Sequence, residues 1–419
     1  MANQNLTAVE YARTMLMLAK NELVMGRLVD GQYKNEVNSE NGLSINIKRP
    51  PRFNRNDASA LNANFAAQDV LTGSVNVVVN QYAKAHVAFG DIESVQSVNA
   101  LLKNATMKSA ASTIAHQIDA FLHSKALGFH SWIAGTAPGT ISGNATDPTK
   151  LIATPAMASA AFTRLRQMGV PSTDISGVFT DDDAQSISGS LVGGFIPDVN
   201  KPALLRSRVP MVGNVNWYGT QQCPSLTTGT RVQGDGSSTG AQLDGASQNV
   251  NYRDVKTTNQ QTILLKGAGN AKTYKTGEVF TIQGCYAWDW RNNQQLANLQ
   301  QFTIVGATQT SSAGGAVTLT ISPPIIVQGT SDGTSTDANT AFGTVANAPA
   351  DSSYLQFAGA LSTILPIRYA FHKQAIALVS TPLQMPVTGV AAQVHDAETG
   401  ISIRYWRNSD FATGIHGHR

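Results

Sequence analysis

The chain has 419 residues, of which 14% are charged, and its formal net charge is +3. This length predicts about two or three domains. The charged fraction lies well below the roughly 25% typical of soluble proteins, which favours surfaces that other chains cover, because charged residues are depleted in interface cores. The mild net charge argues against a dedicated nucleic-acid-binding protein, which concentrates Lys and Arg on one face. The one dense basic cluster runs from Lys48 to Arg55.

Cysteine content and hydropathy indicate the cellular compartment in which the chain is made. The two cysteines, Cys223 and Cys285, exclude a disulfide framework, and we expect both thiols to be reduced. No apolar run reaches the roughly 18 residues that a membrane span needs. Residues 1–10 lack the basic and apolar regions of a signal peptide. We therefore expect a chain made in the cytoplasm, with no membrane partner.

The first 90 residues predict an arm and a long hairpin. Residues 6–30 are predicted to form a helix, and Thr7 with Glu10 makes a capping-box pattern at its start. Since no partner segment lies nearby in the sequence, we expect this helix to be an arm that docks on something else. Alternating residues predict one strand at 44–48 and another at 74–80 that continues through 86–89. A long polar stretch joins the two strands, and such a loop is unusual inside a compact domain. We expect it to reach a neighbouring chain.

The longest predicted helix covers residues 94–127. Asp91, Glu93 and Ser94 lie at its start, where they satisfy free N–H groups and the helix dipole. Its length would be about 50 Å at ~1.5 Å per residue, enough for a structural spine. A helix at 155–168, a strand at 178–180 and a helix at 181–191 are expected to follow.

Composition shifts near residue 215 to a Gly-, Ser-, Thr-, Asn- and Gln-rich stretch that runs to about 350. Strands are predicted there at 262–265, 279–283, 302–305 and 316–321, with Gly314-Gly315 as a hairpin signal. This pattern predicts a small β-sandwich or barrel, inserted between helical segments, with mobile linkers at 234–249 and 327–350. Further strands are predicted at 367–371, 375–380 and 400–406.

No residue pattern predicts catalysis or a metal site. Asp181-Asp182-Asp183 is predicted to cap the helix that begins there, and His116, His123 and His130 are interpreted as helix-face residues because no other ligand repeats with them. The segment from Gly267 to Thr273 lacks the glycine that a phosphate loop needs before its lysine and is predicted to be a turn. His416-Gly417-His418 is predicted to be a solvated tail. We expect a non-enzyme without cofactor or metal.

The order of these segments resembles a known family. The segments that carry the resemblance are residues 45–53, residues 75–89 with the helix that follows, the strands at 274–282, 302–305 and 317–321, and residues 371–375, 382–383 and 400–404. Together they resemble the major capsid proteins of tailed bacteriophages with the Hong-Kong-ninety-seven-type fold, and specifically the podovirus-type coat proteins that carry an inserted β-barrel domain. Chains of this family usually run on to a final strand after the last segment. This sequence ends at Arg419, so the presence of a closing strand is left open.

The resemblance implies an α+β fold with seven segments. They are the N-terminal arm (1–43), the extended loop hairpin (44–90), the peripheral domain with the spine helix (91–152), the first axial-domain segment (153–215), the inserted β-barrel domain (216–354), the second axial-domain segment (355–378) and the return into the peripheral domain (379–419).

The resemblance also implies a function and partners. The chain would assemble into hexamers and pentamers of an icosahedral shell that encloses packaged double-stranded DNA, and it would be located in the virion after assembly in the host cytoplasm. Expected partners are further copies of the chain, a scaffolding protein, a portal protein, a decoration protein and, weakly and without specificity, the packaged DNA. Candidate inter-subunit contacts are Lys48, Arg49, Arg52 and Arg55 in the extended loop, and Asp235 and Asp244 in the inserted domain.

Two other classes of protein remain as alternatives. A tail-tube or baseplate protein would share the small-residue composition, although the long helix argues against a mostly β tube subunit. A secreted β-rich hydrolase or adhesin would need a signal peptide and catalytic motifs, and neither is apparent in the sequence.

Overall fold

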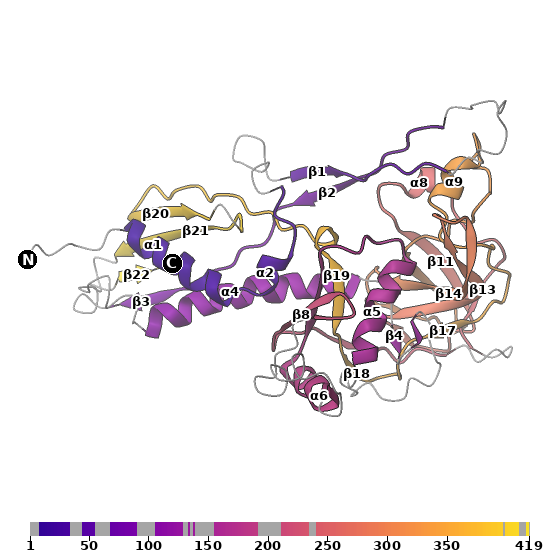
Figure 1. The fold of residues 1–419 in the computed structure, drawn as a ribbon, viewed down its shortest axis with the longest axis horizontal. Helices are drawn as coiled ribbons and strands as arrows, with labels where there is room; N and C mark the ends of the chain where they lie inside the picture. The colour runs from indigo at the N-terminus through magenta and orange to yellow at the C-terminus, as the bar shows by residue number, and fades with distance from the viewer. Residues whose placement is uncertain are drawn as a thin grey trace, which may run out of the picture. The chain divides into compact units, whose positions relative to one another are not determined.

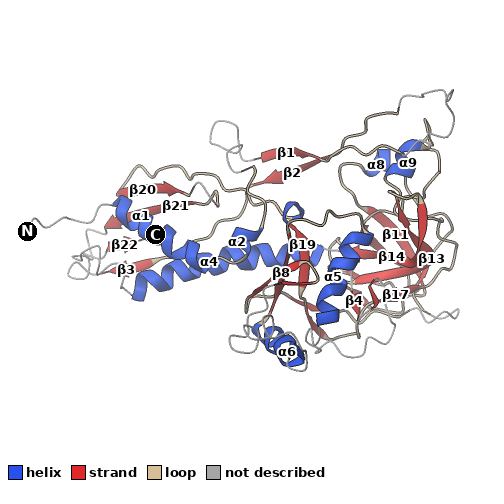
Figure 2. Cartoon of the chain, in the orientation of Figure 1, coloured by secondary structure: helices blue, strands red, loops and turns tan. Residues whose placement is uncertain are grey.

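A computed structural model of the chain describes residues 8–33, 44–54, 68–89, 105–128, 133–134, 137–138, 155–191, 211–233, 240–396, 399–409 and 416–418 (Figure 1, Figure 2). The chain folds into two compact units. The first comprises residues 1–47, 76–124 and 373–419, and the second comprises residues 48–75 and 125–372.

In the first unit, helix α1 (Ala8–Glu22) buries one face. Ala12, Met15 and Ala19 recur every three or four residues and are each at most 8% exposed, which is the spacing of a single helix face. Met15 and Ala19 join an apolar core with Met107 of α4 and with Ile403 of β21. The predicted arm helix therefore docks on other elements of its own unit.

The arm is not one continuous helix as predicted, because it breaks before α2 (Met25–Leu28). The carboxylate of Asp119 accepts hydrogen bonds from the Val24 N–H at 2.8 Å and from the Gly26 N–H at 3.1 Å. Asp119 is 3% exposed. Burial raises the pKa of this carboxyl, and the backbone N–H groups oppose that shift. The buried carboxylate thus fixes the break against helix α4.

Helix α4 (Ala105–Lys125) confirms most of the predicted spine helix, followed by the 3₁₀ turn η1 (Ala126–Gly128). The predicted first turns, with Asp91, Glu93 and Ser94, lie outside the described residues. His123 of this helix is 1% exposed. Burial lowers its pKa to about 4.

A four-stranded antiparallel sheet completes the first unit. In sheet order its strands are β20 (Val390–His395), β21 (Ser402–Ser409), β22 (His416–His418) and β3 (Val87–Phe89). Residues 416–418 are therefore a strand that pairs with β3, and the prediction of a solvated tail is wrong. Strand β22 lies between β21 and β3 in the sheet order. The predicted strand at 375–380 is also wrong, because the 3₁₀ turn η2 (Lys373–Ala375) and a single bridge between Ala377 and Asp30 are found there.

The predicted hairpin is present as a two-stranded sheet of β1 (Ser44–Lys48) and β2 (Ser74–Val78). Contrary to the prediction, β2 does not continue into residues 86–89, since β3 is a separate strand of the four-stranded sheet.

The second unit contains a small mixed sheet flanked by two helices. The sheet has the order β19 (Tyr369–His372), β6 (Ile175–Phe179), β8 (Val215–Gly219) and β7 (Met211–Val212), and β6 runs parallel to β8. The predicted helices are confirmed as α5 (Pro155–Gln167) and α6 (Asp181–Leu191). Their core includes Ile175, Ile187 and Trp217. A short ribbon pairs β4 (Ile133–Ala134) with β5 (Ala137–Pro138).

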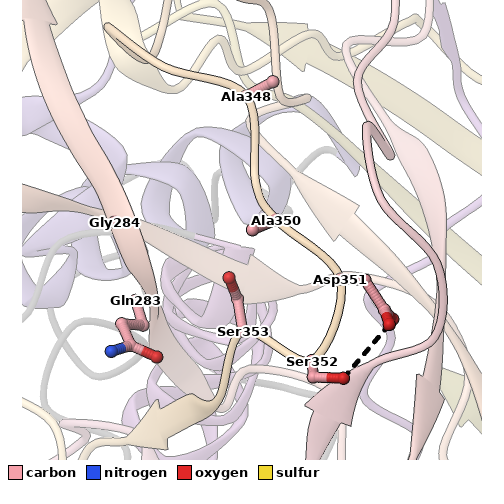
Figure 3. A pocket seen from close by; sticks show the side chains of 7 residues that line it. All are labelled: Gln283, Gly284, Ala348, Ala350, Asp351, Ser352 and Ser353. Atoms are coloured by element: carbon pink, nitrogen blue, oxygen red, sulfur yellow. Dashed lines mark hydrogen bonds between the residues drawn. The ribbon is translucent and has the colours of Figure 1, made fainter.

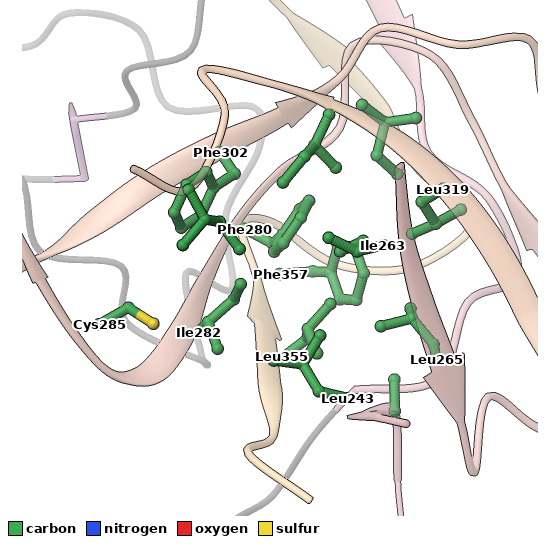
Figure 4. Close-up of a cluster of buried hydrophobic side chains, with 14 of the residues drawn as sticks. Leu243, Ile263, Leu265, Phe280, Ile282, Cys285, Phe302, Leu319, Leu355 and Phe357 are labelled. Atoms are coloured by element: carbon green, nitrogen blue, oxygen red, sulfur yellow. The ribbon is translucent and has the colours of Figure 1, made fainter. Parts of the chain in front are cut away.

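The predicted β-domain is a nearly closed barrel in the same unit. Its strands, in sheet order, are β10 (Gln242–Leu243), β11 (Gln261–Lys266), β16 (Val317–Ser322), β14 (Gln294–Ile304), β13 (Val279–Asp289) and β17 (Leu355–Phe357). A bridge between Gln242 and Tyr354 joins the first strand to the segment before the last. Phe280, Phe302 and Phe357 are fully buried inside (Figure 4), because alternate residues of each strand point to the barrel interior.

Short elements complete the barrel domain. They are β9 (Ser225–Thr227), which pairs with β18 (Ile364–Pro366), β12 (Thr273–Tyr274), which pairs with β15 (Gln309–Thr310), and the helices α8 (Tyr252–Val255) and α9 (Asp337–Ala341). Residues 327–350, expected as a linker, contain α9 and a bridge between Val327 and Val345. The segment from Gly267 to Thr273 is the predicted turn before a strand.

Candidate assembly sites

The first leg of the extended loop, residues 48–54, lies on the barrel domain. The guanidinium carbon of Arg52 lies 4.8 Å from the centre of the Trp290 ring and 5.5 Å from that of Phe342. Attraction between a cation and a ring face operates at this range. Desolvation lowers the pKa of Arg52, and the nearby Arg291 adds to the shift. The same cause lowers the pKa of Arg49.

Asn54 ends this leg and ties it both to the second leg and to the barrel domain. Its backbone N–H donates to Gln68 Oε1 at 2.8 Å, and Gln68 Nε2 donates back to the Asn54 carbonyl at 3.0 Å. Its Nδ2 donates to Asp337 Oδ1, in the first turn of α9, at 3.1 Å. The two legs are thus paired where the described residues of the loop end.

The second leg, residues 68–75, is held by an ion-pair chain. Arg253 of α8 donates through Nη2 to Asp69 at 3.2 Å and through Nε to Asp332 at 3.1 Å. The Asp332 side chain is fully buried. Its pKa is lowered, first by the N–H of Ser335. The ion pair with the buried Asp332 therefore holds Arg253 in position to pair with Asp69 of the loop.

The second leg also approaches the barrel domain closely through backbone and apolar contacts. A Cβ placed on Gly73 would lie 1.9 Å from the carbonyl oxygen of Lys256, so only glycine fits there. The Gly73 carbonyl accepts the N–H of Arg49 at 2.8 Å. Leu71 packs against the buried pair Tyr252 and Val255.

The tip of the β13–β14 hairpin contacts both this loop and the end of α5. Arg291 donates to the carbonyl of Gly169, and a Cβ on Gly169 would lie 2.9 Å from Trp290 Nε1. Asn298 Nδ2 donates to Gln167 Oε1 at 3.3 Å. Trp290, in the barrel domain, therefore contacts both the extended loop and the segment that follows helix α5.

The predicted inter-subunit contact residues differ in where the structure places them. Arg49 and Arg52 make contacts inside the second unit, and Lys48 ends β1. Asp244 lies exposed just after β10, and its carboxylate makes no ion pair with any described residue. Arg55 and Asp235 lie outside the described residues.

Sequence reasoning missed the partners of the loop. They are Arg253, Trp290, Asp332 and Asp337. The run from Trp288 to Arg291 is rich in aromatic and charged residues and was the one signal of a contact site in the sequence. It does not indicate which residues the site contacts.

A shallow pocket of about 330 Å³ lies beside the loop that carries Asp244 (Figure 3). Asp351 is the one ionisable side chain among the described residues that line it. It accepts hydrogen bonds from Lys266 Nζ at 2.7 Å and from the Gly245 N–H at 2.9 Å. These contacts, Lys266 first, lower its pKa to about 2.

The acidic run at the start of α6 acts as a cap, as predicted. Asp183 Oδ2 accepts the backbone N–H of Thr180 at 3.0 Å, and its carboxylate pairs with Arg368 at 2.6 Å. Within the described ranges, no three His, Cys, Asp or Glu residues gather as metal ligands. Helices of the described segments lack the length and apolar content required to cross a bilayer.

A sequence model of the family described as "P22 coat protein - gene protein 5" matches residues 1–418. The chain belongs to this family. It is accordingly a non-enzymatic phage coat protein, and it forms the capsid of the virion.

Three solved structures are similar to the chain. The CUS-3 coat protein I-domain is 21% identical, over 32% of this chain and 97% of that chain, with a TM-score of 0.20. A structure titled Mycobacterium phage Che8 is 13% identical, over 71% and 90%, with a TM-score of 0.36. The capsid of the cyanophage P-SCSP1u is 13% identical, over 72% and 84%, with a TM-score of 0.31. No curated protein matches the chain.

Proposed function

We propose that the coat protein assembles into hexamers and pentamers through its extended loop and N-terminal arm. The observation that carries this proposal is the extended loop itself, whose legs are held on the barrel domain while residues 55–67 connect them. Contacts between identical copies that close into five- or six-membered rings are heterologous. A loop that reaches a neighbour supplies such a contact, and the basic residues Lys48 and Arg55 are candidates for making it.

We also propose the division of labour that the family resemblance implies. The arm (1–43) and the extended loop (44–90) would clasp neighbouring subunits. The segments 91–152 and 379–419 would form the peripheral domain. The axial segments (153–215 and 355–378) would surround the fivefold and sixfold positions. The barrel domain (216–354 as predicted, although strand β17 of the barrel lies just beyond this bound) would stabilise each subunit.

A second contact is proposed at the loop around Asp244, together with Asp235. The exposed carboxylate of Asp244 makes no ion pair with the described residues, so it is available to a basic group of another copy. Electrostatic complementarity of this kind fixes the register between partners more than it adds affinity.

Charge reversal tests this contact. We expect Asp235→Lys combined with Asp244→Lys to reduce closed shells in electron micrographs of expressed protein, because the new lysines would repel the basic partner. Asp254→Lys is a matched control, since Asp254 is an exposed carboxylate of the same domain. Unchanged shell yield in the double variant would remove these two residues from the interface.

The finer partners are proposals as well. A scaffolding protein would direct curvature, a portal protein would occupy one vertex, and a decoration protein would bind the outside. Packaged DNA would touch the shell weakly and without sequence preference, as the net charge of +3 suggests. Co-expression with neighbouring genes, followed by sedimentation of the shells, tests which proteins travel with them.

A further inference from the structure

We propose that the barrel domain is a brace that holds and aims the extended loop of its own chain. The brace surface consists of Arg253, Trp290, Asp332, Asp337 and Phe342. The inference rests on the proposed function of the extended loop as the contact with a neighbour, and it assigns to the inserted domain a role in positioning that loop.

The brace surface gathers residues from three separate segments of the barrel domain. Arg253 comes from α8, Trp290 from the tip of the β13–β14 hairpin, and Asp337 from α9. The rings of Tyr252 and Phe342 stack with a centroid separation of 3.6 Å. Asn339 is fully buried and accepts the N–H of Tyr252 at 2.9 Å. This network fixes α8 to α9, so the surface is set before the loop arrives.

The loop offers a different kind of contact at each point. Arg52 lies over aromatic rings, Asn54 donates to the Asp337 carboxylate, and Asp69 pairs with Arg253. Leu71 adds an apolar contact. Both legs are held, and Gln68 pairs them with each other through Asn54. Several weak contacts on both legs define the direction of the loop better than one strong contact on a single leg.

The occupant of the brace is the loop of the same chain. The loop and the barrel domain are covalently connected, so in a free subunit the effective concentration of the loop at its own brace exceeds that of loops from other copies in solution. Fixing both legs sets the two points at which the loop leaves the barrel domain and returns to it. The brace thus prepares the loop for assembly without taking part in the contact between copies.

Cross-linking within and between chains tests the proposal. Cysteines at Asn54→Cys and Asp337→Cys replace two groups that lie 3.1 Å apart. A short bis-maleimide would be applied to free subunits and to assembled shells, and the products separated in denaturing gels. Single-cysteine variants serve as controls. The native thiols are poor targets, because burial raises the pKa of Cys223 and of Cys285 to about 12.

We expect cross-linked single chains in both preparations and no ladder of joined chains. A ladder in the shells would show that a neighbour's loop occupies the surface. Absence of any cross-link in free subunits would show that the loop is not docked there. Either result overturns the brace. The pair Asp69→Cys and Arg253→Cys repeats the test on the second leg, in case the first pair fails to fold.

The test separates the brace from the proposed assembly function. Shells that form with joined chains would overturn the brace alone. Failure of the unmodified chain to form shells under any condition would count against the proposed loop contact, whatever the cross-links in the free subunit show.

Discussion

At the scale of single residues, the buried ion pair of Arg231 and Glu278 connects the segments where the chain enters and leaves the barrel domain. Both side chains are 1% exposed, and Arg231 Nη1 lies 2.9 Å from Glu278 Oε1. Arg231 Nη2 also donates to the carbonyls of Ala358 and Gly359, and Glu278 accepts the N–H of Gly229. The pair therefore joins strands β13 and β17 to the segment that enters the domain.

Removal of the cation alone tests this pair. We expect Arg231→Met to lower the free energy of unfolding by about 3–5 kcal/mol, because it leaves a buried carboxylate without its counter-charge. Urea unfolding of the purified subunit measures the change. Lys266→Met is the matched control, because its pair with Asp351 is solvent-exposed and contributes little to stability. Equal losses in the two variants would contradict the assigned role.

His123 gives a pH dependence of stability. Its pKa in the folded subunit is about 4, below the value of about 6.5 in an unfolded chain. The unfolded state therefore binds more protons between these values, so this contribution to stability is present above pH 6.5 and is lost as the pH falls toward 4. We expect a loss on the order of 2 kcal/mol between pH 7 and pH 5.

The neutral variant His123→Gln should lose less stability than the wild type over the same pH interval. His395→Gln, at an exposed histidine, is the control and should follow the wild type. A wild-type and His123→Gln difference that stays constant from pH 7 to pH 5 would refute the assignment.

Residue partners were the feature of the site that the sequence predicted least. Arg52 could be selected as part of a basic cluster, and Asp244 as an acidic residue of a loop. Their partners could not, because the ring over which Arg52 lies belongs to Trp290, in a separate segment of the chain. Only the folded topology brings such residues together.

At the scale of elements, the parallel pair of β6 and β8 depends on a glycine. A Cβ on Gly177 would lie 2.5 Å from Cε3 of Trp217, which β8 places opposite. We expect Gly177→Ala to destabilise the subunit by about 1–3 kcal/mol, because the indole has to shift in a packed core. Gly128→Ala is the control, since a Cβ there meets nothing within 4 Å. Thermal unfolding of both variants decides, and equal midpoints would contradict the packing argument.

Elements with strong periodicity could be predicted, whereas those that depend on distant partners could not. The barrel strands alternate buried and exposed residues, and α4 to α6 carry regular apolar faces or acidic starts. The break between α1 and α2 escaped prediction because Asp119 of another helix imposes it. Strand β22 escaped because its two histidines and glycine have little strand propensity, and pairing with β21 and β3 orders it.

At the scale of the whole molecule, the order of the segments indicated more than any motif. A shell protein has no catalytic signature, so function had to be predicted from an arm, a long hairpin, a spine helix and an inserted barrel. Family membership bears out that prediction. The barrel domain was expected only to stabilise its subunit and to contact other copies. Its contacts with the extended loop add a role that composition and periodicity do not indicate.

Cryo-electron microscopy of the particles that form when the chain is expressed with its neighbouring genes tests the central claim most directly. We expect closed icosahedral shells built from hexamers and pentamers of this chain. At side-chain resolution, Arg52 of each copy should lie over Trp290 of the same copy. Tubes, or dispersed subunits under every condition of expression, would contradict the assignment as the capsid-forming protein.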